Sequence, residues 1–124
     1  MSIKAIVIPT LLSEKLYITD IEDYRSYYPI IGCRCFTLIS LYEDDKVSVD
    51  CYLDDEGRLN DSPINQYWER AYKDGSLSYP LYGISVLNLT SQDDGESVGL
   101  DLDLVKKVLK DFSFSEEELS VLCG

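Results

Sequence analysis

Two neighbouring stretches of alternating apolar residues constrain the fold of this chain most strongly. Side chains two positions apart lie on the same face of an extended strand, so each stretch presents one apolar face. These faces are formed by Ile31, Cys33, Cys35, Ile39 and Leu41 in the first stretch and by Val47, Val49, Cys51 and Leu53 in the second. The polar segment Glu43-Asp44-Asp45 between them predicts a turn, so residues 31–41 and 46–53 are expected to form a β-hairpin.

Further strands are expected on both sides of this hairpin. Residues 3–8 form a β-branched apolar run that ends before Pro9, which predicts a strand buried on both faces and central in a sheet. Residues 81–89 predict another strand, and an acidic loop follows over 91–99. Residues 11–18 are ambiguous, and a second short strand is one interpretation of them.

A first helix is expected between the N-terminal strand and the hairpin. Thr19 and Glu22 match the capping-box pattern, in which each side chain bonds the backbone N–H of the other residue. This pattern predicts a short helix over residues 20–27. Pro29 is expected to end it, because the residue before a proline is disfavoured in helical conformation.

Three later helices are expected, over residues 63–72, 102–112 and 115–122. Ser62-Pro63 looks like an N-cap followed by a proline at the first helical position, and Gly75 follows the end of that helix. The helix over 102–112 is predicted by apolar residues at helical spacing opposite lysines. Ser115 and Glu118 form a second capping box.

The order of these elements predicts the fold class. The succession β-α-β-β-α-β-α is typical of an α+β fold, a small, mostly antiparallel sheet of four to five strands with two to three helices packed on one face. A length of 124 residues without a linker or repeat predicts a single domain over residues 1–124. The segment Asp54-Asp55-Glu56-Gly57 predicts a turn after the hairpin, with Gly57 free to adopt a positive φ.

The charge of the chain bears on its partners. The net charge is −12, and half of it lies in residues 43–61, which hold eight acids and two bases. Such a charge repels a phosphate backbone, so direct nucleic-acid binding is not expected and a partner protein with a basic surface is favoured. A purely solubilising role for the acids is the alternative. The candidate partner-binding residues are Glu43, Asp44, Asp45, Asp54, Asp55 and Glu56.

The residues that usually carry catalysis are missing or poorly placed. The chain has no histidine, and neither a GxSxG nor a GxxxxGK[ST] motif occurs. Its four cysteines form no CxxC pair, so neither a zinc site nor a disulfide is expected, and free thiols in a reducing cytoplasm are favoured. Carboxylates at Asp54, Asp55 and Glu56 could bind a divalent cation, but their spacing is first of all that of a turn. A protein that is not an enzyme and needs no metal or cofactor is therefore expected.

Aromatic residues suggest a second kind of binding. Ten tyrosines and one tryptophan are present, and they cluster in residues 24–28 and 67–72. Aromatic rings can stack on nucleotide bases, and arginines can hold phosphates. The candidate residues for a small nucleotide ligand are Arg58, Asn65, Trp68, Arg70 and Tyr72. The alternative for Trp68 is packing of the helix against the sheet.

One stretch of the chain carries a family resemblance. The sequence from Cys51 to Leu59 (CYLDDEGRL), followed by Pro63 and Asn65, is similar to a motif of domain of unknown function 3846, a small family of phages and other mobile elements. The strand Lys4–Ile8 (KAIVI) and residues 83–87 resemble that family as well. The resemblance covers residues 3–94, and the chain departs from it by extra residues around 11–17 and by its tail beyond residue 100. It implies a mobile-element origin and no particular reaction.

These observations lead to two functional hypotheses. The first is a phage or mobile-element accessory protein that binds and inhibits a host nucleic-acid-handling or defence protein through its acidic surface. The second is an oligomeric sponge that sequesters a nucleotide second messenger and so counters defence signalling, which leaves a homo-oligomer open. No signal peptide and no run of about 20 apolar residues is visible, so a location in the host-cell cytoplasm, away from the membrane, is expected.

Overall fold

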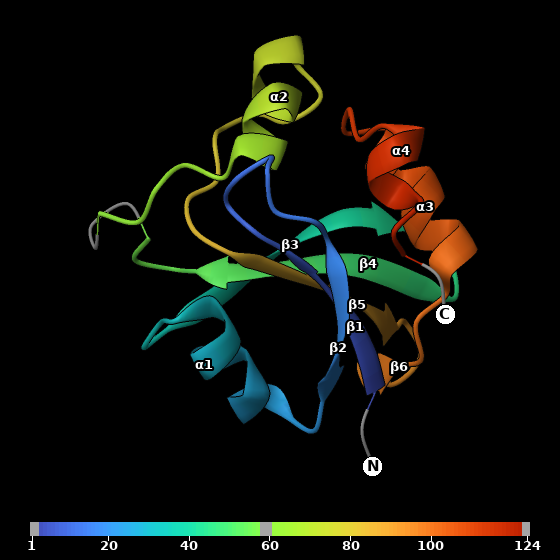
Figure 1. Cartoon of the computed structure of the whole chain (residues 1–124). Coiled ribbons are helices and arrows are strands. Elements are labelled where there is room, and N and C mark those ends of the chain that lie inside the picture. Colours follow the sequence, from blue (N-terminus) through green and yellow to red (C-terminus); the bar gives the residue numbers. More distant parts are fainter. Residues whose placement is uncertain (1–2, 58–60, 123–124) are drawn as a thin grey trace.

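One antiparallel sheet organises the chain. The computed structural model describes residues 3–57 and 61–122, and the sheet is shown in Figure 1. Its strands are β1 (Ile3–Ile8), β2 (Tyr17–Ile21), β3 (Phe36–Glu43), β4 (Val47–Asp54), β5 (Ser85–Ser91) and β6 (Ser97–Val98). They follow the order β2-β1-β5-β4-β3, and the short β6 pairs with β5. The predicted α+β fold class with one antiparallel sheet is therefore confirmed, and the predicted hairpin is β3 and β4.

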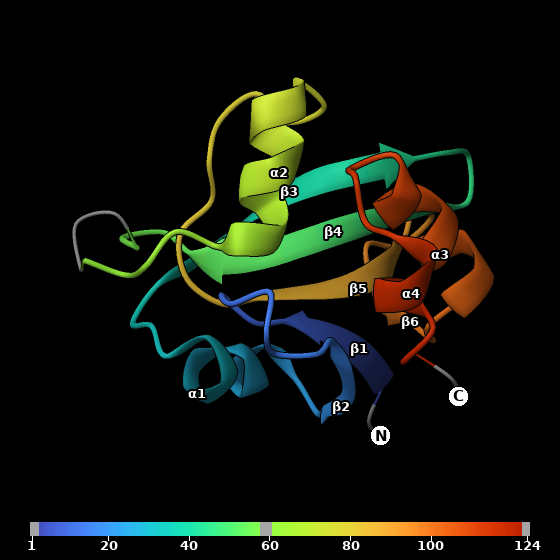
Figure 2. The same ribbon diagram turned by 45° about the horizontal axis from the view of Figure 1, so that its top comes forward.

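Helices lie on both faces of this sheet. They are η1 (Tyr24–Ser26), α1 (Tyr27–Ile31), α2 (Gln66–Asp74), α3 (Leu102–Lys110) and α4 (Glu116–Leu119). Figures 1 and 2 show α2, α3 and α4 on one face and α1 on the opposite face. The expectation that all helices cover one face is wrong, because α1 buries Tyr27 and Ile31 against a second apolar surface of the sheet.

Alternation along the strands builds a separate core on each face. In β4, Val49, Cys51 and Leu53 face the α2–α4 side, where they join the larger core. The neighbouring Tyr52 points to the other face and packs against the smaller core beneath α1. Because one strand serves two cores, its residues are buried almost continuously, as expected for an inner strand.

Strand β1 shows the same double burial. Ile6 and Ile8 belong to the larger core, and Ala5 and Val7 belong to the smaller one. The predicted burial of this strand on both faces is confirmed. The centre of the sheet is β5, and β1 lies beside it.

The first predicted helix is wrong at its start. Thr19 lies in β2, where it pairs with Ala5 of β1, so no capping box forms with Glu22. Asp23 caps the following turn instead, since its carboxylate accepts from the backbone N–H of Arg25. Pairing of β2 with β1 buries Ile21 in the smaller core, a tertiary gain that outweighs a local cap.

Pro29 lies inside α1 and does not end it. It occupies the first turn, where backbone N–H groups have no partner within the helix, so the missing N–H removes no hydrogen bond. The helix ends at Gly32, whose φ of 76° is left-handed. Strand β3 then begins at Phe36, later than expected, so the predicted common strand face holds for Ile39 and Leu41 but not for Ile31, Cys33 and Cys35.

Helix α2 begins later than predicted. Its N-cap is Asn65, whose side-chain oxygen accepts from the backbone N–H groups of Tyr67 and Trp68, and not Ser62. The predicted end is confirmed, because Gly75 forms the left-handed C-cap with a φ of 88°. The helix α3 and the capping box of Ser115 that starts α4 are confirmed as well.

Gly57 is required for a reason that differs from the predicted one. It does not adopt a positive φ. A Cβ atom at this position would lie 3.2 Å from the carbonyl oxygen of Tyr82, so a side chain would crowd the neighbouring segment. The strand expected over 81–89 begins at Ser85, and the expected acidic loop over 91–99 contains β6.

Candidate functional site

The six candidate acids lie at the two ends of the hairpin. Glu43, Asp44 and Asp45 form the turn that enters β4, and Asp54, Asp55 and Glu56 follow its other end. The eight residues of β4 span seven steps of about 3.3 Å each, so the two groups are separated by roughly 23 Å. The structure therefore does not bring the six carboxylates into one patch.

Most of the acids at the exit of β4 are buried or form contacts within the chain. Asp54 is buried and accepts from the backbone N–H of Glu56 at 2.9 Å, which is the predicted turn chemistry. Glu56 is half-buried and lies 3.6 Å from the Arg34 guanidinium. Asp55 alone of the three is exposed. This end offers little free negative charge.

The group at the entrance of β4 is exposed and rigidly held. The Asp44 carboxylate accepts from the backbone N–H groups of Lys46 at 2.8 Å and Val47 at 2.9 Å, and from the Tyr42 hydroxyl at 2.8 Å. Hydrogen bonds from Val47, Lys46 and Tyr42, in that order, lower the pKa of Asp44, so it stays ionised while it fixes the turn.

A second acidic turn lies beside the first. Val47 pairs with Ser91, and the backbone N–H of Gln92 donates to the carbonyl of Lys46 at 2.9 Å, so the β5–β6 turn and the hairpin turn are neighbours. The two turns together form what we call the acidic end, which consists of the exposed residues Glu43, Asp44, Asp45, Asp93, Asp94 and Glu96. Lys46 is the one base in residues 43–46 and 92–96. The sequence shows both acidic segments, but only strand pairing shows that they meet.

The residues proposed for a nucleotide ligand do not form a binding site. The side chain of Trp68 is fully buried, and its indole N–H donates to the Ser85 hydroxyl at 2.8 Å. Asn65 is also fully buried and caps α2, while its amide donates to the carbonyls of Ile8 and Gly83. Stacking of a base on Trp68 is therefore wrong, because the core already covers the ring.

Two of the other candidates, Arg70 and Tyr72, lie on α2 within the described residues. Arg70 forms a two-bond ion pair with Glu118 of α4, at 3.0 and 2.8 Å. Tyr72 is exposed, and Arg58 lies outside the described residues. Trp68 instead packs α2 into the core, as the alternative interpretation expected. The rings of Phe112 and Phe114 contact its indole edge to face.

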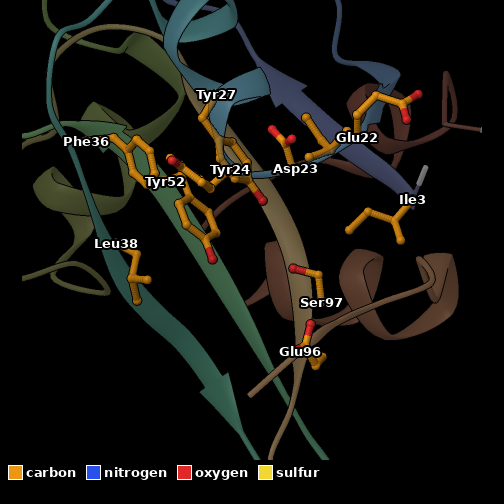
Figure 3. A pocket seen from close by; sticks show the side chains of 11 residues that line it. Ile3, Glu22, Asp23, Tyr24, Tyr27, Phe36, Leu38, Tyr52, Glu96 and Ser97 are labelled. Atoms are coloured by element: carbon orange, nitrogen blue, oxygen red, sulfur yellow. The ribbon is translucent and has the colours of Figure 1, made fainter. Parts of the chain in front are cut away.

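An open groove of roughly 540 Å³ lies on the α1 face of the sheet (Figure 3). Its aromatic lining is Tyr24, Tyr27, Phe36 and Tyr52, its acidic lining is Glu22, Asp23 and Glu96, and the remaining lining residues are Ile3, Ile21, Leu38 and Ser97. Figure 3 shows the aromatic side chains gathered on one side and Glu96 and Ser97 on the other. Glu96 belongs to both the groove and the acidic end.

The aromatic rings form one packed cluster. Tyr27 stacks on Tyr52 with ring centroids 4.3 Å apart, and Phe36 lies 5.3 Å from Tyr27 and 5.7 Å from Tyr52. Tyr28 extends the cluster from Phe36 to Tyr24. The sequence indicates the group of tyrosines in residues 24–28, but Phe36 and Tyr52 join it only through the fold.

A buried polar network continues along the same sheet face. Both carboxylate oxygens of Asp50 accept hydroxyl hydrogen bonds, from Ser40 at 2.9 Å and from Thr90 at 2.7 Å. Burial, and then the charge of Asp50, raises the pKa of the Tyr52 hydroxyl. Burial also raises the pKa of the Tyr27 hydroxyl, and the neighbouring Tyr52 and the charge of Asp50 raise it further. Tyr27 and Tyr52 therefore remain protonated and lie in the field of a buried carboxylate.

Asn88 connects this network to the groove. Its side-chain amide nitrogen donates to the hydroxyl oxygens of Tyr27 and Ser97, two residues of the groove lining. Its side-chain oxygen is buried and accepts no hydrogen bond within residues 3–57 and 61–122. Sequence patterns gave no sign of Asn88 or Asp50, because both are polar residues inside strands.

Two absences among the described residues bear on metal binding and membrane insertion. No group of three or more His, Cys, Asp or Glu side chains is placed to hold a metal ion in the described part of the chain. None of the helices described is long and apolar enough to cross a membrane. The cysteines Cys33, Cys35 and Cys51 are free thiols.

Comparison with known proteins identifies the family. A family model described as a domain of unknown function, DUF3846, matches residues 3–113. The chain belongs to this family. The DUF3846 match continues past residue 94, where the resemblance seen in the sequence stops, and it includes α3. The acidic end and the groove thus lie within the DUF3846 domain. Searches of curated proteins and of solved structures return no match.

Proposed function

We propose that this DUF3846 protein acts by binding, as an acidic inhibitor of a partner protein with a basic surface. The acidic end is its contact surface in this proposal. The supporting observation is the meeting of two turns that expose six carboxylates beside a single lysine. A phage or mobile-element origin, and a host nucleic-acid-handling or defence protein as the partner, belong to the same proposal.

Electrostatics supports this assignment. A surface of one sign accelerates encounters with a surface of the opposite sign and disfavours wrong partners. A groove that normally holds nucleic-acid phosphates is basic, so clustered carboxylates can occupy it and exclude the nucleic acid. The chain therefore inhibits by occupying the groove of its partner, and it needs no chemical reaction.

The rigidity of the acidic end also supports binding. Asp44 holds the hairpin turn through two backbone N–H groups, and Asp94 accepts from the backbone N–H of Glu96 at 3.0 Å in the other turn. The backbone N–H of Gly95 donates to the carbonyl of Ser91, which closes that second turn. Carboxylates on fixed turns lose little conformational entropy when a partner binds.

The test compares two variants with the same change in charge. Glu43→Gln, Asp45→Asn, Asp93→Asn and Asp94→Asn neutralise the acidic end and leave Asp44 in its turn. The control carries Glu14→Gln, Asp61→Asn, Asp111→Asn and Glu117→Gln, which are exposed acids outside both turns. Host proteins captured by the wild type are identified, purified and titrated against all three forms by calorimetry.

The acidic-end variant is expected to bind the purified partner at least about tenfold more weakly, whereas the control keeps most of the affinity. Affinity of the wild type should also fall steeply between roughly 0.05 and 0.5 M salt, since screening shortens the range of surface charge. Equal affinities of the two variants, or a salt-insensitive complex, would overturn the proposal.

A further inference from the structure

The groove on the α1 face has an acidic lining without a base. Glu22, Asp23 and Glu96 line it, and no lysine or arginine within residues 3–57 and 61–122 does. Asp23 is engaged by Arg25, whose guanidinium donates to its carboxylate at 2.7 Å. Glu22 and Glu96 form no ion pair within the described chain. The groove is thus lined by two carboxylates without an ion pair among the described residues.

Buried Asp50 adds a third negative charge. It is 4% exposed, and its oxygens are bonded to two hydroxyl groups, with no cation paired to it among the residues described. A buried charge is costly unless a countercharge or several hydrogen bonds compensate it. Asp50 lies on the same face as Tyr52, two positions along β4, and its charge acts on both stacked tyrosines of the groove.

The floor of the groove suits a flat cation. The aromatic cluster includes Tyr24, which is 62% exposed, and the guanidinium of Arg25 lies over its ring, 6.0 Å from the centroid, so the rim of the groove already accommodates a guanidinium. The Asn88 amide nitrogen holds the Tyr27 and Ser97 hydroxyls of the lining in place from beneath the groove. A ligand with a positive charge and a planar face fits the acidic and aromatic lining.

We propose that this groove binds an arginine side chain of the partner protein. The guanidinium lies over the exposed aromatic surface and in the field of Glu22, Glu96 and Asp50. Arginine fits better than lysine, because its planar group stacks on rings and carries five donors. The inference rests on the proposed function, since the arginine belongs to the basic surface that meets the acidic end, and Glu96 joins the two sites.

The test uses blocked arginine, N-acetyl-L-arginine N-methylamide, and its citrulline counterpart, which has nearly the same shape and no charge. Each is titrated into the isotope-labelled full chain, and backbone amide shifts are followed by NMR. Arginine should shift the amides of Glu22, Tyr24 and Ser97 in a saturable manner. Citrulline should bind roughly two- to fivefold more weakly, as expected for loss of a cation–ring contact.

Substitutions in the groove test whether arginine binds there. Tyr24→Ala and Glu96→Gln change exposed side chains and should each weaken arginine binding roughly two- to fivefold. Tyr79→Ala is the matched control, because Tyr79 is similarly exposed and lies outside the groove. Equal binding of arginine and citrulline, shifts confined to other residues, or no shift at all would overturn the inference.

The same experiments separate this inference from the proposed function. The variant neutralised at Glu43, Asp45, Asp93 and Asp94 keeps the groove residues and should still bind blocked arginine. If blocked arginine does not bind but this variant loses the partner, the groove inference alone is overturned. If arginine binds the groove but the variant keeps full partner affinity, the proposed function is overturned and the groove remains a site for arginine.

Discussion

Tyr27 of α1 and Tyr52 of β4 stack face to face, with ring centroids 4.3 Å apart and an interplanar angle of 8°. The contact fastens a five-residue helix to the open face of the sheet. It also builds the floor of the groove from residues 25 positions apart in the chain. The candidate arginine site therefore depends on the docking of α1.

The Tyr27 hydroxyl is expected to contribute to stability. Tyr27→Phe keeps the stacked ring but removes the oxygen that accepts from the Asn88 amide, a buried donor. The free energy of unfolding should fall by roughly 1–3 kcal/mol, as for a buried polar group that loses its partner. Urea unfolding measures this loss of free energy. Tyr79→Phe, at an exposed tyrosine, is the control and should change stability by less than about 0.5 kcal/mol. Equal stabilities of the two variants would contradict the assigned hydrogen bond.

Cys51 should make the fold sensitive to alkali. Burial raises the pKa of its thiol from 9.0 to about 12, so above pH 9 the unfolded chain loses a proton that the folded chain keeps. This contribution is fully present below pH 9 and is lost as the pH rises toward 12. Between about pH 8 and 10, the free energy of unfolding of Cys51→Val should fall less than that of the wild type, by roughly 1.4 kcal/mol.

Urea unfolding midpoints at the two pH values test this linkage. Cys35→Ser is the control, because it removes a thiol that is exposed and lies outside both cores. An identical pH dependence of wild type and Cys51→Val would show that the Cys51 thiol titrates normally.

The ion pair between Arg70 and Glu118 should link α2 to α4. Glu118→Gln removes the charge that holds the guanidinium, and we expect a loss of roughly 1–2 kcal/mol in the free energy of unfolding. Burial acts to raise the pKa of Glu118, but hydrogen bonds from Arg70 and Ser115 outweigh it and the pKa is lowered below 4.5. The stabilisation is therefore present above pH 4.5 and is lost as the pH falls through the lowered pKa.

Denaturant unfolding at neutral pH and at about pH 3 follows the Glu118 contribution. Glu117→Gln, at the exposed neighbouring acid, should change stability by less than about 0.5 kcal/mol. A Glu118→Gln variant as stable as this control would mean that the pair is only a surface contact.

Trp68 should act as a core residue. Trp68→Ala removes a fully buried ring and is expected to destabilise the fold by about 3–5 kcal/mol. Tyr72→Ala, one turn along the same helix and exposed, should cost less than about 1 kcal/mol. Fluorescence offers a direct check, because Trp68 is the one tryptophan of the chain. Its emission should be blue-shifted and shielded from acrylamide, and strong quenching of the native protein would contradict the burial.

Local sequence signals predicted the elements that local chemistry stabilises. The apolar alternation of residues 47–53 fixes which side chains of β4 share a face, whatever covers them. Ser115 and Glu118 form their capping box because both partners lie within one turn. Gly75 ends α2 because a glycine adopts the left-handed conformation without a side-chain clash. In each case the deciding interaction spans only a few residues.

Tertiary contacts decided what those signals could not. Thr19 and Glu22 match a capping box, yet residues 17–21 form β2, since pairing with β1 buries Ile21. Trp68 looks the same in sequence whether it stacks on a ligand or fills a core, and only the position of the sheet selects burial.

The acidic character of the protein came from the sequence alone, whereas its arrangement came from the fold. The six candidate partner-binding acids are close in the chain but lie at opposite ends of β4, because an extended strand carries them apart. Asp93 and Asp94 are almost 50 residues from Asp45, and antiparallel pairing of β4 with β5 places them in neighbouring turns. Composition and periodicity are properties of the chain, but a binding surface is a property of which segments meet in space.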